Sequence, residues 1–215
     1  MWVEKYSPEK ILIKGELYLF LKRVVDSILI IFTSIVWLPL LGLIFIVMKI
    51  KEPRAPVFFS QIRTGQGGQR FRMYKIRTMV ENAEELKKDL LPLNELEWPD
   101  FKITDDPRVT NFGKILRKTS LDELPQFFNV LKGEMSLVGP RPTSFSSKTY
   151  KLWQTKRLDV IPGITGLWQM TGRGETDFDD RLRIDIAYIE HRCLMLDYEI
   201  LLKSFFVVLK GQGKH

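Results

Sequence analysis

Two adjacent carboxylates, Asp122 and Glu123, are the residues of this sequence best suited to chemistry. They follow Ser120 within residues 114–126, KILRKTSLDELPQ, and the pattern Ser-x-x-Glu is typical of a capping box at the start of a helix. We expect this helix to begin at Ser120 and to end at Gly133. Taken alone, the segment favours a structural role, in which Glu123 bonds the cap amide and Asp122 complements the positive helix end.

The same geometry also suits chemistry on phosphate groups. A helix N-terminus attracts phosphate and lowers the pKa of a nearby carboxyl group, so Asp122 would stay ionised and nucleophilic beside a diphosphate. Glu123 could then hold a divalent cation or accept a proton. Four basic residues are candidates to hold the phosphate oxygens: Lys75, Arg77, Arg117 and Arg141. Each could instead be a surface charge, and this is least expected of Arg141, which stands between two prolines.

A long apolar run precedes these residues. Residues 27–48 carry no charge, and 15 of the 22 are Ile, Leu, Val or Phe, which predicts insertion into a membrane. As a straight helix the run would be long enough to cross the hydrocarbon core. Pro39 near its midpoint removes the hydrogen bond to the Ile35 carbonyl and predicts a kink or break. Thr33 and Ser34 are placed to bond the freed carbonyls.

Basic residues flank the apolar run on both sides. Lys22 and Arg23 precede it, and Lys49, Lys51 and Arg54 follow it, so both ends are expected on the cytoplasmic side. A helix-break-helix hairpin that enters one leaflet and returns satisfies this pattern. A kinked single-pass helix is the alternative, and the residues alone separate the two only slightly. A cleaved signal peptide does not fit, because the run starts late and ends in lysines.

Charge and cysteine content narrow the function classes. The formal net charge is +7, and residues 49–80 contain eight Lys or Arg and one acidic residue directly after the apolar run. That position favours anionic lipid headgroups and phosphates over nucleic acid. Cys193, the single cysteine, cannot form an internal disulfide, which is consistent with a reducing cytoplasm.

The remaining segments predict mostly helices around a small β-hairpin. Residues 16–26 form an amphipathic interfacial helix, 56–62 and 71–79 form two strands around a turn at 65–68, 80–91 form a charged helix, 94–106 form a loop, and 198–209 form a helix against the membrane or the core. The glycines at 65–68 lack the Gly-Lys-Ser/Thr ending of a P-loop.

The glycine-rich residues 161–173 could bring Gln169 and Arg173 close to a ligand. Trp168 in the same segment is expected to be packed or interfacial. Among the aspartates that follow, Asp177 is a weak candidate for a metal or ribose contact, and a solvated surface position is the stronger interpretation.

The residues from Leu116 to Pro142, LRKTSLDELPQFFNVLKGEMSLVGPRP, resemble the core signature of the bacterial sugar transferase family, the monotopic phosphoglycosyl transferases. The resemblance extends back through KRVVDS and KIRTM and forward through PGITGLWQMTGR, and it covers nearly all of the chain after Lys22. The family's membrane hairpin breaks at a Ser-Pro pair. Pro39 matches that proline, but Leu38 precedes it, so the form of the break departs from the pattern.

The resemblance implies a two-step reaction. Asp122 would attack the β-phosphate of a UDP-sugar and release UMP, and undecaprenyl phosphate would then accept the phosphosugar from the covalent intermediate. Glu123 matches the second member of the family's catalytic pair, Asp122 and Glu123 are expected to hold Mg2+, and Arg141 matches a phosphate-binding arginine. The segments GLWQ and VVLKGQG resemble members that transfer glucose or galactose 1-phosphate in the synthesis of exopolysaccharide, capsule or lipopolysaccharide O-antigen.

Together these features predict a mostly helical α+β protein. Residues 1–26 are expected to form an amphipathic helix, 27–48 a re-entrant hairpin broken near Pro39, and 49–215 a catalytic domain on the cytoplasmic face of the bacterial inner membrane. The expected partners are a UDP-sugar, undecaprenyl phosphate and membrane lipids, without nucleic acid, and a homo-oligomer is compatible with the sequence. The rival interpretation is a non-enzymatic membrane adaptor that binds anionic lipids.

Overall fold

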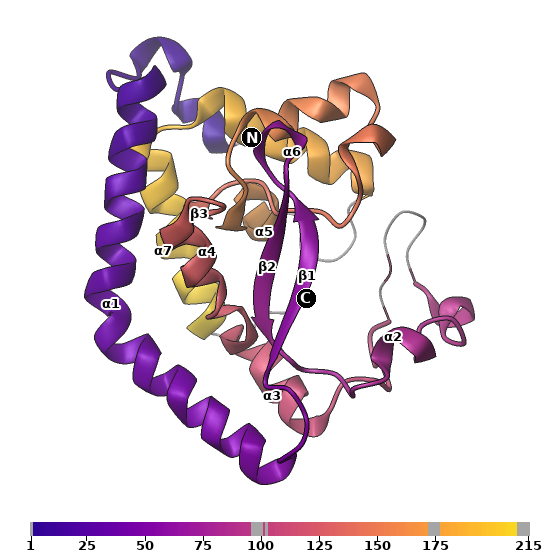
Figure 1. The fold of residues 1–215 in the computed structure, drawn as a ribbon. Coiled ribbons are helices and arrows are strands. Elements are labelled where there is room, and N and C mark those ends of the chain that lie inside the picture. Colours follow the sequence, from indigo (N-terminus) through magenta and orange to yellow (C-terminus); the bar gives the residue numbers. More distant parts are fainter. Residues whose placement is uncertain (1, 96–100, 102, 172–176, 210–215) are drawn as a thin grey trace.

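The computed structural model describes residues 2–95, 101, 103–171 and 177–209. Within them the protein is mostly helical, with two small sheets (Figure 1). The helices are α1 (Gly15–Lys51), α2 (Ala83–Leu86), α3 (Asn111–Lys118), α4 (Gln126–Lys132), α5 (Leu167–Thr171), α6 (Phe178–His191) and α7 (Leu194–Leu209). The strands are β1 (Phe58–Thr64), β2 (Arg70–Ile76), β3 (Ser136–Val138) and β4 (Gly163–Thr165), and short 3-10 turns connect these elements.

Helix α1 is one continuous helix of 37 residues that includes the amphipathic segment 16–26 and the apolar run. Before it, two 3-10 turns, Trp2–Lys5 and Pro8–Lys10, replace the first part of the helix predicted over 1–26. Helix α1 bends partway along its length but does not break into two helices (Figure 1), and Pro39 lies inside it. The predicted helix-break-helix is therefore replaced by a bent helix. The predicted side-chain bonds also differ, because Thr33 and Ser34 donate to the carbonyls of Leu29 and Ile31 and not to that of Ile35.

One face of α1 packs against the rest of the protein along the whole helix. Its buried apolar residues are Tyr18, Ile30, Trp37, Leu41, Ile44 and Met48. Near the start of α1, Arg23 donates to the carbonyls of Val130 and Leu131 in α4. At its end, Glu52 pairs with Arg77 just after β2, at 2.6 Å. Both ends of the helix thus contact the same folded domain.

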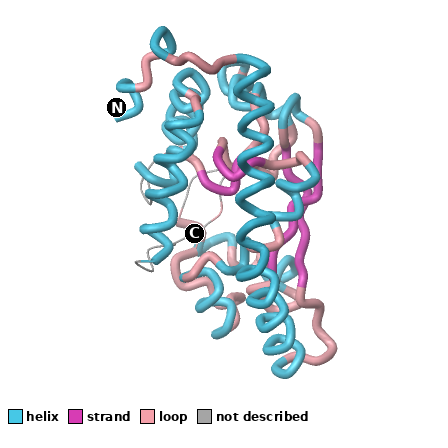
Figure 2. Tube along the Cα trace, turned by 90° about the vertical axis from the view of Figure 1, so that its left-hand side faces the viewer, coloured by secondary structure: helices cyan, strands magenta, loops and turns pink. Residues whose placement is uncertain are grey.

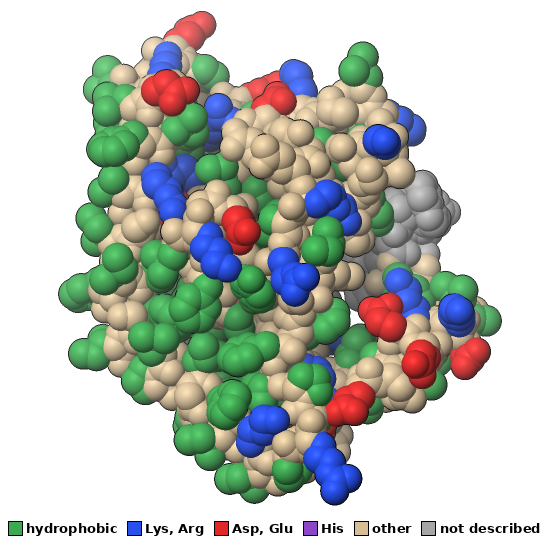
Figure 3. Space-filling view, in the orientation of Figure 1, with side chains coloured by type: hydrophobic (Ala, Val, Ile, Leu, Met, Phe, Trp, Pro, Cys, Tyr) green, Lys and Arg blue, Asp and Glu red, His purple; other side chains and the backbone are tan. Residues whose placement is uncertain are grey.

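The opposite face of α1 is apolar and exposed. Figure 3 shows hydrophobic side chains along the edge of the molecule that α1 forms. The exposed residues of this face include Ile28, Ile31, Phe32, Ile35, Val36, Leu43 and Ile46. Exposed apolar surface of this extent indicates a surface that is covered by lipid or by another molecule.

The predicted β-hairpin is confirmed. Strands β1 and β2 pair antiparallel, from Phe58 opposite Ile76 to Thr64 opposite Arg70. The turn between them contains Gly67 and Gly68 with positive φ, the conformation that favours glycine. Strand β2 ends at Ile76, three residues before the predicted end. Figure 2 shows the hairpin on one side of the helices.

Two other predicted helices differ in extent. The charged segment 80–91 has a helix over four residues only, α2, and the rest consists of turns. Its many charged side chains provide little apolar surface to bury, so packing does not extend the helix. The segment 198–209 lies within α7, which starts earlier, at Leu194. Of the predicted loop 94–106, residues 96–100 and 102 lie outside the described residues.

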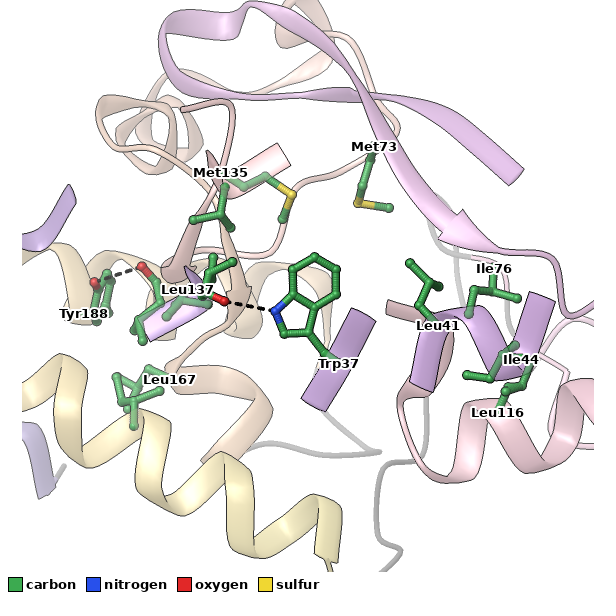
Figure 4. Packing of buried hydrophobic residues seen from close by; sticks show 14 of the residues in the cluster. Trp37, Leu41, Ile44, Met73, Ile76, Leu116, Met135, Leu137, Leu167 and Tyr188 are labelled. Atoms are coloured by element: carbon green, nitrogen blue, oxygen red, sulfur yellow. Dashed lines mark hydrogen bonds between the residues drawn. The ribbon is translucent and has the colours of Figure 1, made fainter. Parts of the chain in front are cut away.

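The core joins α1 to the elements that carry the candidate site. Figure 4 shows Leu41 and Ile44 of α1 beside Ile76 of β2 and Leu116 of α3. Trp37 makes edge contacts with Phe127 and Phe128 of α4, with ring centroids 5.4 Å apart in each case. Its indole also donates to the Ile30 carbonyl about two turns earlier, at 3.0 Å. The apolar helix is therefore part of the core and not an independent anchor.

Candidate active site

The two carboxylates lie in a single 3-10 turn, Leu121–Glu123, between α3 and α4. Ser120, predicted to cap a helix, instead adopts the left-handed conformation with φ 56° and makes no side-chain cap. The capping box is therefore absent at this turn, and Glu123 turns its carboxylate toward other elements. The helix α4 begins only at Gln126, after Pro125, and it ends at Gly133 as predicted.

Glu123 binds two basic side chains from distant segments. Its Oε1 lies 2.9 Å from Lys75 Nζ on β2 and 2.6 Å from Arg141 Nη2. Glu123 is 6% exposed, so these are largely desolvated ion pairs. Lys75 also lies 3.7 Å from Asp122 Oδ2. The structure therefore brings together four of the predicted site residues: Asp122, Glu123, Lys75 and Arg141.

Asp122 is buried but incompletely paired. It is 3% exposed, and its Oδ1 has no hydrogen-bond partner among the described residues. Gln126, at the start of α4, is fully buried, and its amide oxygen and nitrogen likewise have no partner there. Buried polar atoms are normally satisfied, and exceptions are common at functional sites. Gln126 was not predicted, because no motif or charge distinguishes it in the sequence.

Burial raises the pKa of Asp122, the positive charge of Lys75 opposes this shift, and the negative charge of Glu123 adds to it. The sequence predicted a lowered pKa from a helix N-terminus. That prediction is wrong, because a one-turn 3-10 segment presents little of a helix dipole and the carboxyl group is removed from water.

The other predicted basic residues have different partners. Arg77 bonds Glu52 and the carbonyls of Pro56 and Met79, so it joins the end of α1 to the end of β2. It does not contact the pair of carboxylates Asp122 and Glu123, which we call the dyad. Arg117 donates from Nε to Thr78 Oγ1 at 2.9 Å, and its charge lowers the pKa of Asp122. It contributes electrostatically without a direct bond to the carboxylate.

Of the three candidate site residues in the carboxy-terminal part, only one lies near the dyad in the described structure. Gln169 is buried and donates to the Ile164 carbonyl at 3.3 Å, and Arg141 Nη1 lies 3.5 Å from the same oxygen. Gln169 is thus close to Arg141. Asp177 is exposed at the start of α6 and contacts neither carboxylate. Arg173 lies outside the described residues.

Close contact between two glycine-containing segments positions Arg141. Strands β3 and β4 pair parallel, and Gly139, just after β3, lies against Gly163 and Gly166. A Cβ at Gly163 would approach the Gly139 backbone nitrogen to 2.0 Å, so only glycine allows these two segments to come this close. Gly139, two residues before Arg141, is therefore in backbone contact with the segment that leads to Gln169.

The dyad offers a limited set of ligands for a metal ion. Among the described residues no group of three or more His, Cys, Asp or Glu side chains could hold a cation. Mg2+ is, however, commonly bound by one or two carboxylates together with substrate phosphates and water. The unpaired Oδ1 of Asp122 fits that mode, in which the substrate supplies part of the coordination.

Comparison with known proteins identifies a family and several relatives. The family model described as bacterial sugar transferase matches residues 17–211. The galactosyl transferase CpsE of Streptococcus agalactiae is 49% identical over 79% of this chain and 38% of its own length. The undecaprenyl-phosphate galactose phosphotransferase of Salmonella typhimurium is 43% identical over 91% of this chain and 42% of its own length.

The chain therefore spans less than half of these two relatives. A third relative is matched over most of its length. The exopolysaccharide production protein ExoY of Sinorhizobium fredii is 35% identical over 90% of this chain and 88% of its own length.

Proposed function

Because the chain belongs to the bacterial sugar transferase family, we propose that it moves a hexose 1-phosphate from a UDP-sugar to undecaprenyl phosphate. This reaction would be the first membrane step in the synthesis of an exopolysaccharide, capsule or O-antigen. The observation that carries the proposal is the buried Asp122, whose Oδ1 has no partner among the described residues and whose neighbours Lys75 and Arg141 carry positive charge. The names of two relatives make UDP-galactose the first donor to test.

In the first step, one carboxylate oxygen of Asp122 attacks the phosphorus that bears the sugar. The bond from this phosphorus to the bridging oxygen breaks, and UMP leaves with the electron pair. In the second step, a phosphate oxygen of undecaprenyl phosphate attacks the same phosphorus, and Asp122 is released as a carboxylate. The product is an undecaprenyl diphosphate sugar, and each step exchanges one phosphorus–oxygen bond for another.

Lys75 and Arg141 are the cations that would bind the diphosphate of the donor. Their side chains are 18% and 22% exposed, so each reaches the surface of the site while it holds Glu123. Glu123 keeps both cations beside Asp122, and a preorganised cation stabilises negative charge that develops on phosphate oxygens. The charge of Lys75 also opposes the effect of burial on the Asp122 pKa and so favours the nucleophilic form.

Mg2+ is the proposed cofactor, held by Asp122 and Glu123 together with donor phosphates. When bound, it would neutralise charge on the diphosphate and on the departing UMP.

The proposed location is the cytoplasmic face of the bacterial inner membrane, with α1 immersed in one leaflet. Two observations support a re-entrant path over a crossing one. Both ends of α1 contact the same folded domain, and the outer apolar face is exposed between them. A helix that crossed the bilayer would place its ends on opposite sides, where one compact domain cannot contact both. Exposed Phe205 and Phe206 on α7 add apolar surface for the interface.

The decisive experiment measures UMP release by detergent-solubilised protein with Mg2+, undecaprenyl phosphate and a panel of UDP-sugars. Asp122→Asn removes the nucleophile with little change of shape, and Asp180→Asn, on the exposed surface of α6, is the matched control. We expect UMP from one donor, loss in Asp122→Asn and normal release in Asp180→Asn. Equal UMP release by the wild type and Asp122→Asn would refute the covalent mechanism. Lipid binding without UMP release from any donor would support the adaptor.

A further inference from the structure

The loop that carries Arg141 is held by its backbone carbonyls. The five successive carbonyls of residues 141–145 each accept a hydrogen bond from another segment. The Arg141 carbonyl accepts from Arg157 Nη2 at 2.6 Å and the Pro142 carbonyl from Arg63 Nη1 at 3.2 Å. The Thr143 carbonyl accepts from the Thr64 amide at 2.9 Å, the Ser144 carbonyl from Arg70 Nη1 and Nη2 at 3.1 Å each, and the Phe145 carbonyl from Arg70 Nη1 at 2.8 Å.

Three arginines from two distant segments supply most of these bonds. Arg63 and Arg70 lie on opposite strands of the β-hairpin, and Arg157 lies in the 3-10 segment Leu152–Asp159. Arg157 is in turn paired with Asp185 of α6 at 2.7 Å, and both residues are buried. We call Arg63, Arg70 and Arg157 the loop clamp.

The loop clamp is electrostatically unfavourable in one respect. Burial lowers the pKa of Arg63 to about 10, and the charge of Arg141 acts in the same direction. Among the described residues, Arg63 and Arg70 form no ion pair with an acidic side chain and bind carbonyls of the loop, whereas Arg157 binds both the loop and Asp185. Guanidinium groups suit this role, because their planar donors can bind two acceptors at once.

We propose that the loop clamp is a set of positioning residues that fixes the backbone of residues 141–145 and so holds the Arg141 side chain at the dyad. Arg63 and Arg70 of the β-hairpin would then serve the reaction without contacting the substrate. The inference rests on the proposed role of Arg141 as a ligand of the donor diphosphate.

Arg70→Lys is the sharpest test. Arg70 is exposed, so the substitution preserves the charge and leaves the core unchanged, but a lysine cannot bind the Ser144 and Phe145 carbonyls in the same fork. Arg72→Lys is the matched control, because Arg72 is an exposed arginine two residues further along the same strand. Arg157→Lys is a second variant that disturbs the clamp from the other side.

In a two-step exchange reaction, kcat/KM for each substrate reports its own half-reaction. We expect Arg70→Lys to lower kcat/KM for the UDP-sugar about tenfold, mainly through a higher KM, as is typical when a charged hydrogen bond is lost. The value for undecaprenyl phosphate and the unfolding midpoint should stay unchanged. Arg72→Lys should match the wild type in all three measurements.

Hydrogen–deuterium exchange of the peptide that covers residues 139–147 gives a readout independent of catalysis. We expect faster exchange in Arg70→Lys and Arg157→Lys than in Arg72→Lys. Unchanged exchange in both clamp variants would overturn the inference, as would faster exchange with an unchanged donor kcat/KM. Equal losses for both substrates with a lower unfolding midpoint would also overturn it, because they indicate a general structural role. A failure of the covalent mechanism itself would appear separately, as UMP release by Asp122→Asn.

Discussion

Two buried aspartates, Asp122 and Asp197, have opposite surroundings. Asp197 is 6% exposed and accepts from the Tyr18 hydroxyl at 2.8 Å, from Lys22 Nζ at 2.7 Å and from the Tyr188 hydroxyl at 2.6 Å. Asp122 is 3% exposed, yet its nearest cation is 3.7 Å away and one of its oxygens has no partner among the described residues.

The difference separates a structural carboxylate from a reactive one. Asp197 joins the start of α1 to α6 and α7, and each of its bonds would be lost on unfolding. The open oxygen of Asp122 contributes nothing to stability, because a buried charge without full pairing is unfavourable. A nucleophile needs an accessible lone pair, so incomplete pairing is the condition for its proposed chemistry. Burial alone therefore does not separate the two aspartates, whereas the pairing of their oxygens does.

The largest expected effect is on catalysis at Asp122. Asp122→Asn should reduce UMP release by about 10³-fold or more, because it removes the nucleophile. The free energy of unfolding should stay equal or rise, since an incompletely paired buried charge is replaced by a neutral amide. Steady-state kinetics and urea denaturation of the same preparation would check both parts. A marked loss of stability would mean that Asp122 is a structural residue like Asp197.

The same substitution at Asp197 should change stability. Asp197→Asn leaves Lys22 without its charge partner, so we expect the free energy of unfolding to fall by about 3–5 kcal/mol, as for other broken buried ion pairs. Chemical denaturation in detergent would measure it. UMP release per folded molecule should remain near the wild-type value, and selective loss of activity without loss of stability would contradict the comparison.

A smaller effect is expected at Gln126, the other incompletely paired polar residue near Asp122. Gln126→Met keeps a similar volume and removes two buried atoms without partners, which should raise the free energy of unfolding by about 1–3 kcal/mol. Asn129→Leu should lower the free energy of unfolding, because the buried Asn129 amide bonds the backbone of Arg72 and Tyr74 in β2. Thermal unfolding of the two variants would measure both changes, and a less stable Gln126→Met would contradict the expected effect.

The smallest expected effect is a shift in pH dependence. Asp122 must be ionised to react, so activity falls as pH decreases through its pKa, which burial has raised. Lys75 lowers that pKa, and Lys75→Gln should therefore move the acid limb of the kcat/KM profile for the donor to higher pH. Lys151→Gln, at an exposed lysine, is the control. An acid limb that does not move would show that Lys75 has no electrostatic effect on the nucleophile.

Several features could be predicted from the sequence because they depend on local pattern. The apolar run indicated helical structure over 27–48, the strand residues around Gly67 and Gly68 indicated the hairpin, and Gly133 marked the end of α4. Asp122 and Glu123 were also candidates from the sequence, and two of the four candidate cations, Lys75 and Arg141, lie beside them in the structure. Each of these signals lies in a short stretch of chain whose conformational preference is strong by itself.

Only the tertiary structure decided how those pieces meet. Pro39 is tolerated in a bent, continuous α1 because the helix packs against the domain along one face, so tertiary contacts offset the lost hydrogen bond. Arg77 was a candidate to bind phosphate, but it bonds Glu52. Ser120 was predicted to cap a helix, but it adopts the left-handed conformation. The burial that raises the Asp122 pKa and the loop clamp around Arg141 arise from residues far apart in the chain. Long-range desolvation and pairing depend on which segments become neighbours, and no local pattern of residues specifies that.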